Sequence, residues 1–146
     1  MKNIPQGVEY DYPVLSTDIF TTVVENIGAT LPADRTYDGV NLVSYLNDKK
    51  IGRPHEQLFW RADHIWAIRD GDYKLILSTR DGWAELYDLN TDKSESINLK
   101  DKMPDLYNKL MEKHQEWQEE LPDKPMWPRV MDHKFVLDGK EYLFPA

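Results

Sequence analysis

The chain has 146 residues, of which 30% are charged and 40% apolar; its formal net charge is −8, and it contains no cysteine. These proportions are ordinary for a globular protein, and the acidic balance argues against nucleic acid or an anionic membrane as a partner, because phosphate groups require a basic face. The chain can form neither a disulfide nor a thiolate metal site, and no apolar run approaches the ~20 residues of a membrane span. Residues 1–13 lack the apolar segment of a signal peptide and predict an extended lead-in.

Two helices are expected before any strand. The first spans about Thr17–Ile27 and is followed by Gly28, a residue type that ends helices in the left-handed conformation. Ser16 or Thr17 can cap its first turn. Its apolar residues recur at helical spacing, which is typical of a face that packs into a core: Ile19, Phe20, Val23, Val24 and Ile27. A short second helix is expected over Asn41–Leu46, with Asn41 as its cap.

A small antiparallel sheet is predicted within the aromatic-rich stretch that follows. Apolar and polar residues alternate at period two, which is typical of half-buried strands. Asp70-Gly71 and Asp81-Gly82 interrupt the alternation with residues that tolerate positive φ, as hairpin turns require. We predict three or four strands in a meander from these runs: Gln57–Ala62, Ile65–Ile68, Tyr73–Leu77 and Ala84–Leu89.

The longest predicted helix spans about Pro104–Leu121. One continuous face carries Leu106, Tyr107, Leu110, His114, Trp117 and Leu121. We expect this helix to cover one face of the sheet, with His114 as a hydrogen-bonded core histidine. Three prolines then exclude further helix: Pro122, Pro125 and Pro128. Asp138-Gly139, between two short alternating runs, predicts a terminal hairpin.

Together these elements predict an α+β fold, in which a small antiparallel sheet of about four strands packs against a C-terminal helix. The chain contains five Trp and eight Tyr. The second face of the sheet must therefore be covered as well if these rings are not to stand in water. This requirement is the first indication of a missing partner surface.

Four short motifs follow one another along the chain: Thr17–Gly28, Asp38–Leu42, Ala67–Leu75 and Glu85–Leu99. The first two resemble the D-[IL]-x-[PT]-T helix and the DG-x-[SN]-L turn that follow the catalytic core of type I sulfatases. The third is similar to that family's A-[VI]-R-x-G-x-[WY]-K-L, and the fourth to L-Y-[DN]-L-x-x-D-P-x-E-x-x-N-L. Lys93 stands where the last pattern has proline, a loss that loosens the turn without redirecting it. Each motif alone is weak, but four in the right order are specific.

The resemblance implies the C-terminal portion of a formylglycine-dependent sulfatase, within the alkaline-phosphatase-like superfamily. Residues 1–50 would then end the large catalytic-domain region, and the helix over Thr17–Ile27 would belong to that α/β domain. Residues 51–121 would form the sheet-plus-helix subdomain, and residues 122–146 a Pro-spaced tail with its hairpin. The implied partners are the missing N-terminal sulfatase domain and a sulfated saccharide. The family is often periplasmic or secreted, and this chain leaves its location open.

The family's C/S-x-P-x-R motif, whose Cys or Ser matures to formylglycine, has no position here. The chain has no Cys, and no Ser is followed two residues later by Pro. Calcium and formylglycine are therefore expected only in the missing N-terminal domain. His55, His114 and His133 are scattered, so no metal site is expected in this chain. The resemblance thus implies a sulfuric ester hydrolase, acting on sulfated carbohydrate or aryl sulfate, of which this chain alone is inactive.

Loops of the family's C-terminal subdomain lie at the rim of the active-site pocket. The candidate substrate-binding residues here are Trp60, Arg61, His64 and Trp66. An aromatic ring beside cationic donors suits a sulfated sugar, through stacking and charge-assisted hydrogen bonds. The alternative is that Trp60 and Trp66 are core while Arg61 and Asp63 form a surface pair. Two further cations at hairpin ends, Arg69 and Lys74, are expected in structural ion pairs.

Two other interpretations remain open: a free-standing carbohydrate-binding or interaction module, and a hydrolase with its own unrecognised site. A portion of a larger protein should expose the apolar stripe of the first helix, formed by Ile19, Phe20, Val23, Val24 and their neighbours. A free-standing module should cover it. Turnover of an aryl sulfate by the isolated chain would favour the hydrolase.

Overall fold

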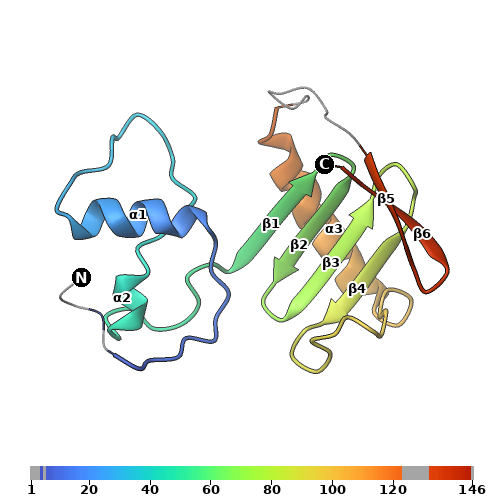
Figure 1. Cartoon of the computed structure of the whole chain (residues 1–146), viewed down its shortest axis with the longest axis horizontal. Coiled ribbons are helices and arrows are strands. Elements are labelled where there is room, and N and C mark those ends of the chain that lie inside the picture. Colours follow the sequence, from blue (N-terminus) through green and yellow to red (C-terminus); the bar gives the residue numbers. More distant parts are fainter. Residues whose placement is uncertain (1–3, 5, 123–131, 146) are drawn as a thin grey trace. The chain divides into compact units, whose positions relative to one another are not determined.

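The structure, a computed structural model, describes residue 4 and residues 6–122 and 132–145. It contains two compact units, Met1–Glu56 and Gln57–Ala146, and each is considered by itself (Figure 1). Pro125 and Pro128, which the sequence places in a linker, lie outside the described residues. Within the described ranges no helix has the length and apolarity needed to cross a bilayer.

The first unit is built around helix α1 (Thr17–Asn26), whose start is fixed by an aspartate rather than by the expected serine cap. Ser16 makes no side-chain cap bond, because its own φ of −62° and ψ of −27° are already helical. Asp18 is fully buried. Its carboxylate accepts the N–H of Leu15 at 2.7 Å and of Val40 at 2.8 Å, and His55 Nε2 lies 2.8 Å away. Asp18 therefore ties together three segments of this unit.

A second helix, α2 (Val43–Leu46), follows a connector that lies along α1. The Asn41 side chain accepts the Val43 N–H at 3.0 Å, as a capping residue does, although the helix begins two residues later than the sequence predicts. Thr22 Oγ1 accepts the Leu42 N–H at 2.9 Å. Gly39 lies so close to the backbone of Thr17 that a Cβ would overlap it. These contacts give a physical reason for the first two motifs to occur together.

The apolar stripe of α1 is exposed, which makes its assignment to the core wrong for this chain. Ile19 is 63% exposed, Phe20 54%, Val23 41% and Ile27 72%. The buried residues of the helix are Asp18 and Thr21 instead. The reason is that the connector packs on the polar side of α1, where it finds hydrogen-bond partners.

The second unit contains the predicted meander, with four strands. They are β1 (Gln57–Ala62), β2 (Ile65–Asp70), β3 (Tyr73–Ser78) and β4 (Ala84–Asp88), hydrogen-bonded in that order and all antiparallel. Gly71 and Gly82 have φ of 62° and 70° in the turns where the sequence places Asp-Gly pairs. The two-residue turn between β1 and β2 is closed by Asp63 with φ of 53°.

Helix α3 (Pro104–Glu119) covers one face of this sheet, as predicted (Figure 1). The strand register places one side chain from each strand in a row on that face: Phe59, Ile68, Leu75 and Leu86. Leu110 of α3 is fully buried in the same cluster, and the Phe59 and Trp117 rings stack with centroids 4.8 Å apart. The α+β fold class predicted from the sequence is confirmed.

His114 of α3 is buried as expected but does not form the expected hydrogen bond. It is 2% exposed, and neither ring nitrogen has a partner among the described residues. Its neighbours are the rings of Trp66, with centroids 4.8 Å apart, and Trp117, at 6.2 Å. The prediction fails because His114 points at the sheet face that α3 covers. The neighbouring groups on that face are rings and aliphatic side chains rather than carbonyl or carboxylate acceptors.

The predicted terminal hairpin is confirmed as a separate two-stranded sheet. It consists of β5 (Asp132–Leu137) and β6 (Lys140–Pro145). Asp138 and Gly139 join the strands with φ of 50° and 77°. Positive φ at both central residues is the geometry of a type I′ turn, whose twist matches that of the flanking strands.

Candidate functional site

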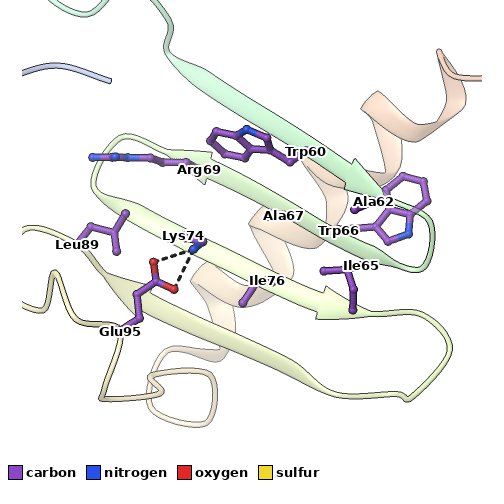
Figure 2. Close-up of a pocket in the computed structure, with 10 residues that line it drawn as sticks. All are labelled: Trp60, Ala62, Ile65, Trp66, Ala67, Arg69, Lys74, Ile76, Leu89 and Glu95. Atoms are coloured by element: carbon purple, nitrogen blue, oxygen red, sulfur yellow. Dashed lines mark hydrogen bonds and ion pairs between the residues drawn. The ribbon is translucent and has the colours of Figure 1, made fainter. Parts of the chain in front are cut away.

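The face of the sheet that α3 does not cover carries an open depression of about 350 Å³ (Figure 2). Its lining combines rings and aliphatic side chains with three charged groups. The lining residues are Trp60, Ala62, Ile65, Trp66, Ala67, Arg69, Lys74, Ile76, Leu89 and Glu95. Depressions of this kind, mostly apolar with a few polar groups, are the usual form of a small-ligand site.

The strand register creates the depression. Trp60 of β1 pairs with Ala67 of β2, which pairs with Ile76 of β3, so the three side chains form one row on this face. Ala67, the middle member of the row, is too small to fill the space between its neighbours. Trp60 is 42% exposed beside this low floor. The result is an accessible indole surface at the edge of an apolar hollow.

One end of the depression holds a strong ion pair. Lys74 Nζ lies 2.7 and 2.8 Å from the two carboxylate oxygens of Glu95, and both side chains are partly buried, at 24% and 33% exposed (Figure 2). The structural ion pair expected for Lys74 is therefore confirmed. Because the partner is bidentate and close, Lys74 brings no net charge to the depression.

Asp92 holds the loop that presents Glu95. Its carboxylate accepts the N–H groups of Ile97 and Ser96, each at 2.8 Å. These bonds, led by the one from Ile97, lower the pKa of Asp92 below its ordinary value. Glu95 itself has a φ of 55°, so the loop is turned tightly around the aspartate. The loop keeps this form although Lys93 replaces the proline of the resembled motif.

Arg69 occupies the same end but does not form the expected ion pair. Its Nε donates to the carbonyl of Gly71 at 3.0 Å, and the structure records no other hydrogen bond or ion pair for it within the described residues. The register places Arg69 directly opposite Lys74, whose ammonium group takes Glu95. Among the residues that the structure describes, Arg69 is thus the cation of the depression without a carboxylate partner.

The candidate rim residues divide between the two faces of the sheet. Trp60 and Arg61 are neighbours in β1, so their side chains point to opposite faces. The Arg61 guanidinium lies 4.4 Å from the centroid of the Trp66 ring and donates to the Pro122 carbonyl at 3.5 Å. Of the four candidates, Arg61 and Trp66 therefore lie together, while the Trp60 side chain is on the other face of the sheet.

The other two candidates are buried. Trp66 is 3% exposed within the core, although it also borders the depression. His64 is 6% exposed, with Nδ1 3.0 Å from Asp63 Oδ2 and Nε2 3.7 Å from Asp81 Oδ2. His64 thus links the β1–β2 turn to the β3–β4 turn. Asp81 is positioned in turn by a hydrogen bond from Ser78, at 2.8 Å, which lowers its pKa.

Arg69 lies with Lys74 on Trp60's own face, although sequence reasoning assigned Arg69 only to a structural role. A signal for its position was present. The Asp70-Gly71 turn fixes the β2–β3 hairpin, and alternation then places Arg69 on the same face as Ala67, whose side chain lies beside Trp60.

Comparison with known proteins gives one consistent result. No protein-family model matches the chain. Human steryl-sulfatase is 43% identical over 67 residues, which is 45% of this chain and 12% of that protein. The uncharacterized sulfatase YdeN of Escherichia coli K12 is 37% identical over 55 residues, or 38% of this chain and 10% of that protein. An arylsulfatase of Hemicentrotus pulcherrimus is 37% identical over 68 residues, which is 46% of this chain and 12% of that protein.

Solved structures agree at the level of the fold. A putative sulfatase from Bacteroides thetaiotaomicron superposes with a TM-score of 0.53 at 24% identity, covering 70% of this chain and 23% of that one. The structure of Ps i-CgsB superposes with a TM-score of 0.65 at 20% identity, covering 80% of this chain and 26% of that one. Over the matched residues the chain is similar to the C-terminal portion of sulfatases. It spans only 10–12% of the length of these curated relatives.

The sequence of the chain offers no position for a formylglycine. It has no Cys and no Ser followed two residues later by Pro. In the part of the chain that the structure describes, no group of three or more His, Asp or Glu side chains is placed to hold a metal ion.

Proposed function

We propose that this chain is the non-catalytic C-terminal part of a sulfuric ester hydrolase, which supports the large N-terminal domain and contributes to the rim of its active site. The observation that carries the proposal is its identity of 36–43% to four curated sulfatases. Since the match covers about a tenth of those proteins, catalysis by the whole enzyme is part of the proposal.

The proposed substrates are sulfated carbohydrates or aryl sulfates. Two curated relatives are named as arylsulfatases and one as a steryl-sulfatase. Ps i-CgsB has been solved with a neocarrahexaose, and BT4656 with D-glucosamine-2-N,6-O-disulfate. The depression with Trp60 is consistent with a saccharide, because an exposed indole is a good stacking surface for a sugar ring.

We further propose that the chain alone does not hydrolyse sulfate esters. The reaction needs an activated nucleophile and cations placed around the sulfate oxygens. Here the Lys74 ammonium is neutralised by Glu95. In this proposal the formylglycine and the calcium ion belong to the N-terminal domain.

The exposed apolar face of α1 is an argument for a large partner that covers it. Ile19, Phe20, Val23 and Ile27 together present a stripe of apolar surface, which a portion of a larger protein is expected to bury elsewhere. The alternative function, a free-standing carbohydrate-binding module, is favoured by the open depression beside Trp60. The exposed stripe counts against it, because a self-sufficient module would cover that face.

An assay of the chain alone tests its inactivity. We expect no release of nitrophenol from 4-nitrophenyl sulfate above the buffer rate, with or without added calcium. Sustained turnover by the purified chain would overturn the proposal and would favour a hydrolase with its own site.

The rim role is tested in a protein that carries the large domain together with this chain. We expect Arg61→Ala to lower kcat/KM for a sulfated saccharide by about tenfold, the usual effect of losing one charge-assisted contact. Arg35→Ala is the control, because Arg35 is exposed and pairs with its neighbour Asp34. An unchanged kcat/KM for Arg61→Ala across several sulfated saccharides would remove the rim role.

A further inference from the structure

We propose that the loop carrying Lys49 and Lys50 is a cleavage site for a trypsin-like protease, and that the cut chain stays together as two associated pieces. The protease adds water across the peptide bond between Lys50 and Ile51, which leaves a carboxylate on Lys50 and an amino group on Ile51. The inference goes beyond the proposed function, because here the chain is the substrate of another enzyme and the site lies wholly in the first unit.

The basic pair supplies the recognition element. Lys49 and Lys50 are the only two adjacent basic residues in the sequence. Trypsin-like proteases place a lysine or arginine side chain in an acidic pocket directly before the bond that they cleave. Residues 48–51 are all exposed, and Ile51, on the far side of the bond, is 96% exposed. The side chains on both sides of the bond are therefore open to a protease.

The backbone of this loop is easily opened. The residues between the end of α2 at Leu46 and the start of β1 at Gln57 form neither helix nor strand (Figure 1). Near the bond, the Lys50 N–H donates to the Ser44 carbonyl at 2.8 Å and the Lys49 N–H to the Asn47 side chain at 3.3 Å. Residues 48–51 bury no side chain, so opening the loop breaks a few local hydrogen bonds and exposes little apolar surface.

Two other exposed cations lack this combination. Lys93 is exposed, but Asp92 accepts two backbone N–H groups of the same loop, each at 2.8 Å, and so holds its backbone in place. The Arg35 guanidinium is held by the carboxylate of Asp34 through two hydrogen bonds, at 2.9 and 2.8 Å. Exposure together with a loosely held backbone thus favours the basic pair as the first site to be cut.

Contacts on either side of the bond keep the two pieces together. Tyr10 Oη donates to the Gly52 carbonyl at 3.0 Å. His55 Nε2 lies 2.8 Å from the fully buried carboxylate of Asp18, and Pro54 beside it is buried. Both contacts join residues before the cut to residues after it, and both lie outside residues 47–51. The new carboxylate and amino group form on exposed residues, where water solvates them without a burial cost.

Limited digestion of the intact chain with trypsin, followed by mass spectrometry, tests the site. We expect the first cut after Lys49 or Lys50, and we expect the two products to elute together in size-exclusion chromatography until urea is added. A first cut elsewhere, for example after Arg35 or Lys93, would overturn the cleavage site. Products that separate without urea would overturn the two-piece form.

A matched pair of variants separates recognition from a general effect of charge. Lys49→Gln/Lys50→Gln should abolish cleavage in this loop, because the acidic pocket of the protease loses its cation. Lys93→Gln/Lys102→Gln removes the same charge from two other exposed lysines and should leave the rate of the first cut unchanged. Equal slowing by both variants would overturn the assignment of the site to the basic pair.

The association of the pieces is tested with His55→Ala. We expect the cut variant to release its two pieces at a lower urea concentration than the cut wild-type chain, since the contact with Asp18 is lost. The uncut variant, measured beside it, reports any loss of fold. Release at the same urea concentration in both cut chains would overturn the role given to this contact.

Discussion

Two polar side chains, Asp18 and His114, are both buried but differ in their hydrogen bonding. Asp18 is fully buried and accepts two backbone N–H groups, with His55 at hydrogen-bond distance. His114 is 2% exposed and has no partner among the described residues. An unbonded buried polar group typically costs about 1–3 kcal/mol, so His114 is a weak point of the core, whereas Asp18 is a strong one.

The His114 site predicts a stability that depends on pH. Burial lowers the pKa of His114 below its ordinary value of 6.5. Below pH 6.5 this histidine binds a proton in the unfolded chain but not in the folded chain. The free energy of unfolding therefore falls as the pH drops below this value, and at higher pH it does not depend on His114. We expect His114→Leu to remove this dependence, which is a slope of as much as about 1.4 kcal/mol in the free energy of unfolding per pH unit.

The measurement is urea unfolding of both chains between about pH 5 and pH 8. The difference between wild type and variant cancels the titration of the other histidines. We expect the variant to gain stability relative to the wild type as the pH falls. A difference that stays constant over this range would show that His114 keeps its ordinary pKa.

At the scale of elements, the connector before α2 is held to α1 by shape as well as by hydrogen bonds. Thr22 Oγ1 accepts a hydrogen bond from the Leu42 N–H, and Asn26 Nδ2 donates one to the Asn41 side chain at 3.1 Å. Gly39 allows the closest approach, since its Cα faces the Thr17 carbonyl without a side chain between them. Gly39 is also without the positive φ found at most other glycines, so sterics alone explain it.

We therefore expect Gly39→Ala to destabilise the chain by about 1–3 kcal/mol, the usual cost of overpacking a site that cannot relax. Gly7→Ala is the control, because Gly7 has a φ of 71° but open space around it. It should cost about 1 kcal/mol through backbone conformation alone. Hydrogen exchange at the Leu42 amide reports on the connector directly. Faster exchange in Gly7→Ala than in Gly39→Ala would contradict this account.

At the scale of the whole molecule, the chain presents an apolar stripe on α1 and an open depression on the sheet of the second unit. The stripe consists of Ile19, Phe20, Val23 and Ile27, all more than 40% exposed. An exposed stripe on a helix is a surface for association, because burying it releases water from apolar groups. It is also the surface that the proposed large domain would cover.

Replacing two of these residues should reduce self-association of the isolated chain. We expect Ile19→Gln/Ile27→Gln to lower the sedimentation-measured fraction of oligomer without lowering Tm, because both side chains are exposed and the net charge is unchanged. Ile97→Gln is the matched control, since Ile97 is 54% exposed but lies in the second unit, outside the stripe. An equal effect of both variants would show that the stripe has no special role.

The sequence predicted the elements of this fold well, and the candidate site only in part. Helix, strand and turn positions follow from periodicity and from the Asp-Gly turns, which are local signals. The lysine of the third motif was correctly assigned to an ion pair. The four rim candidates stay a prediction, with Trp60 and Arg61 on opposite faces of the sheet, and Arg69 was missed because its neighbour Trp60 lies on another strand.

The sequence by itself determined the meander, the helix that covers it and the resemblance to sulfatases, because each depends on residues close together in the chain. Tertiary structure alone decided three other features. It paired β1 with β2 so that Arg69 lies near Trp60, left His114 without a hydrogen-bond partner among the described residues, and exposed the stripe of α1. The physical reason is that register, partner and coverage are set by contacts between distant segments, which local patterns do not specify.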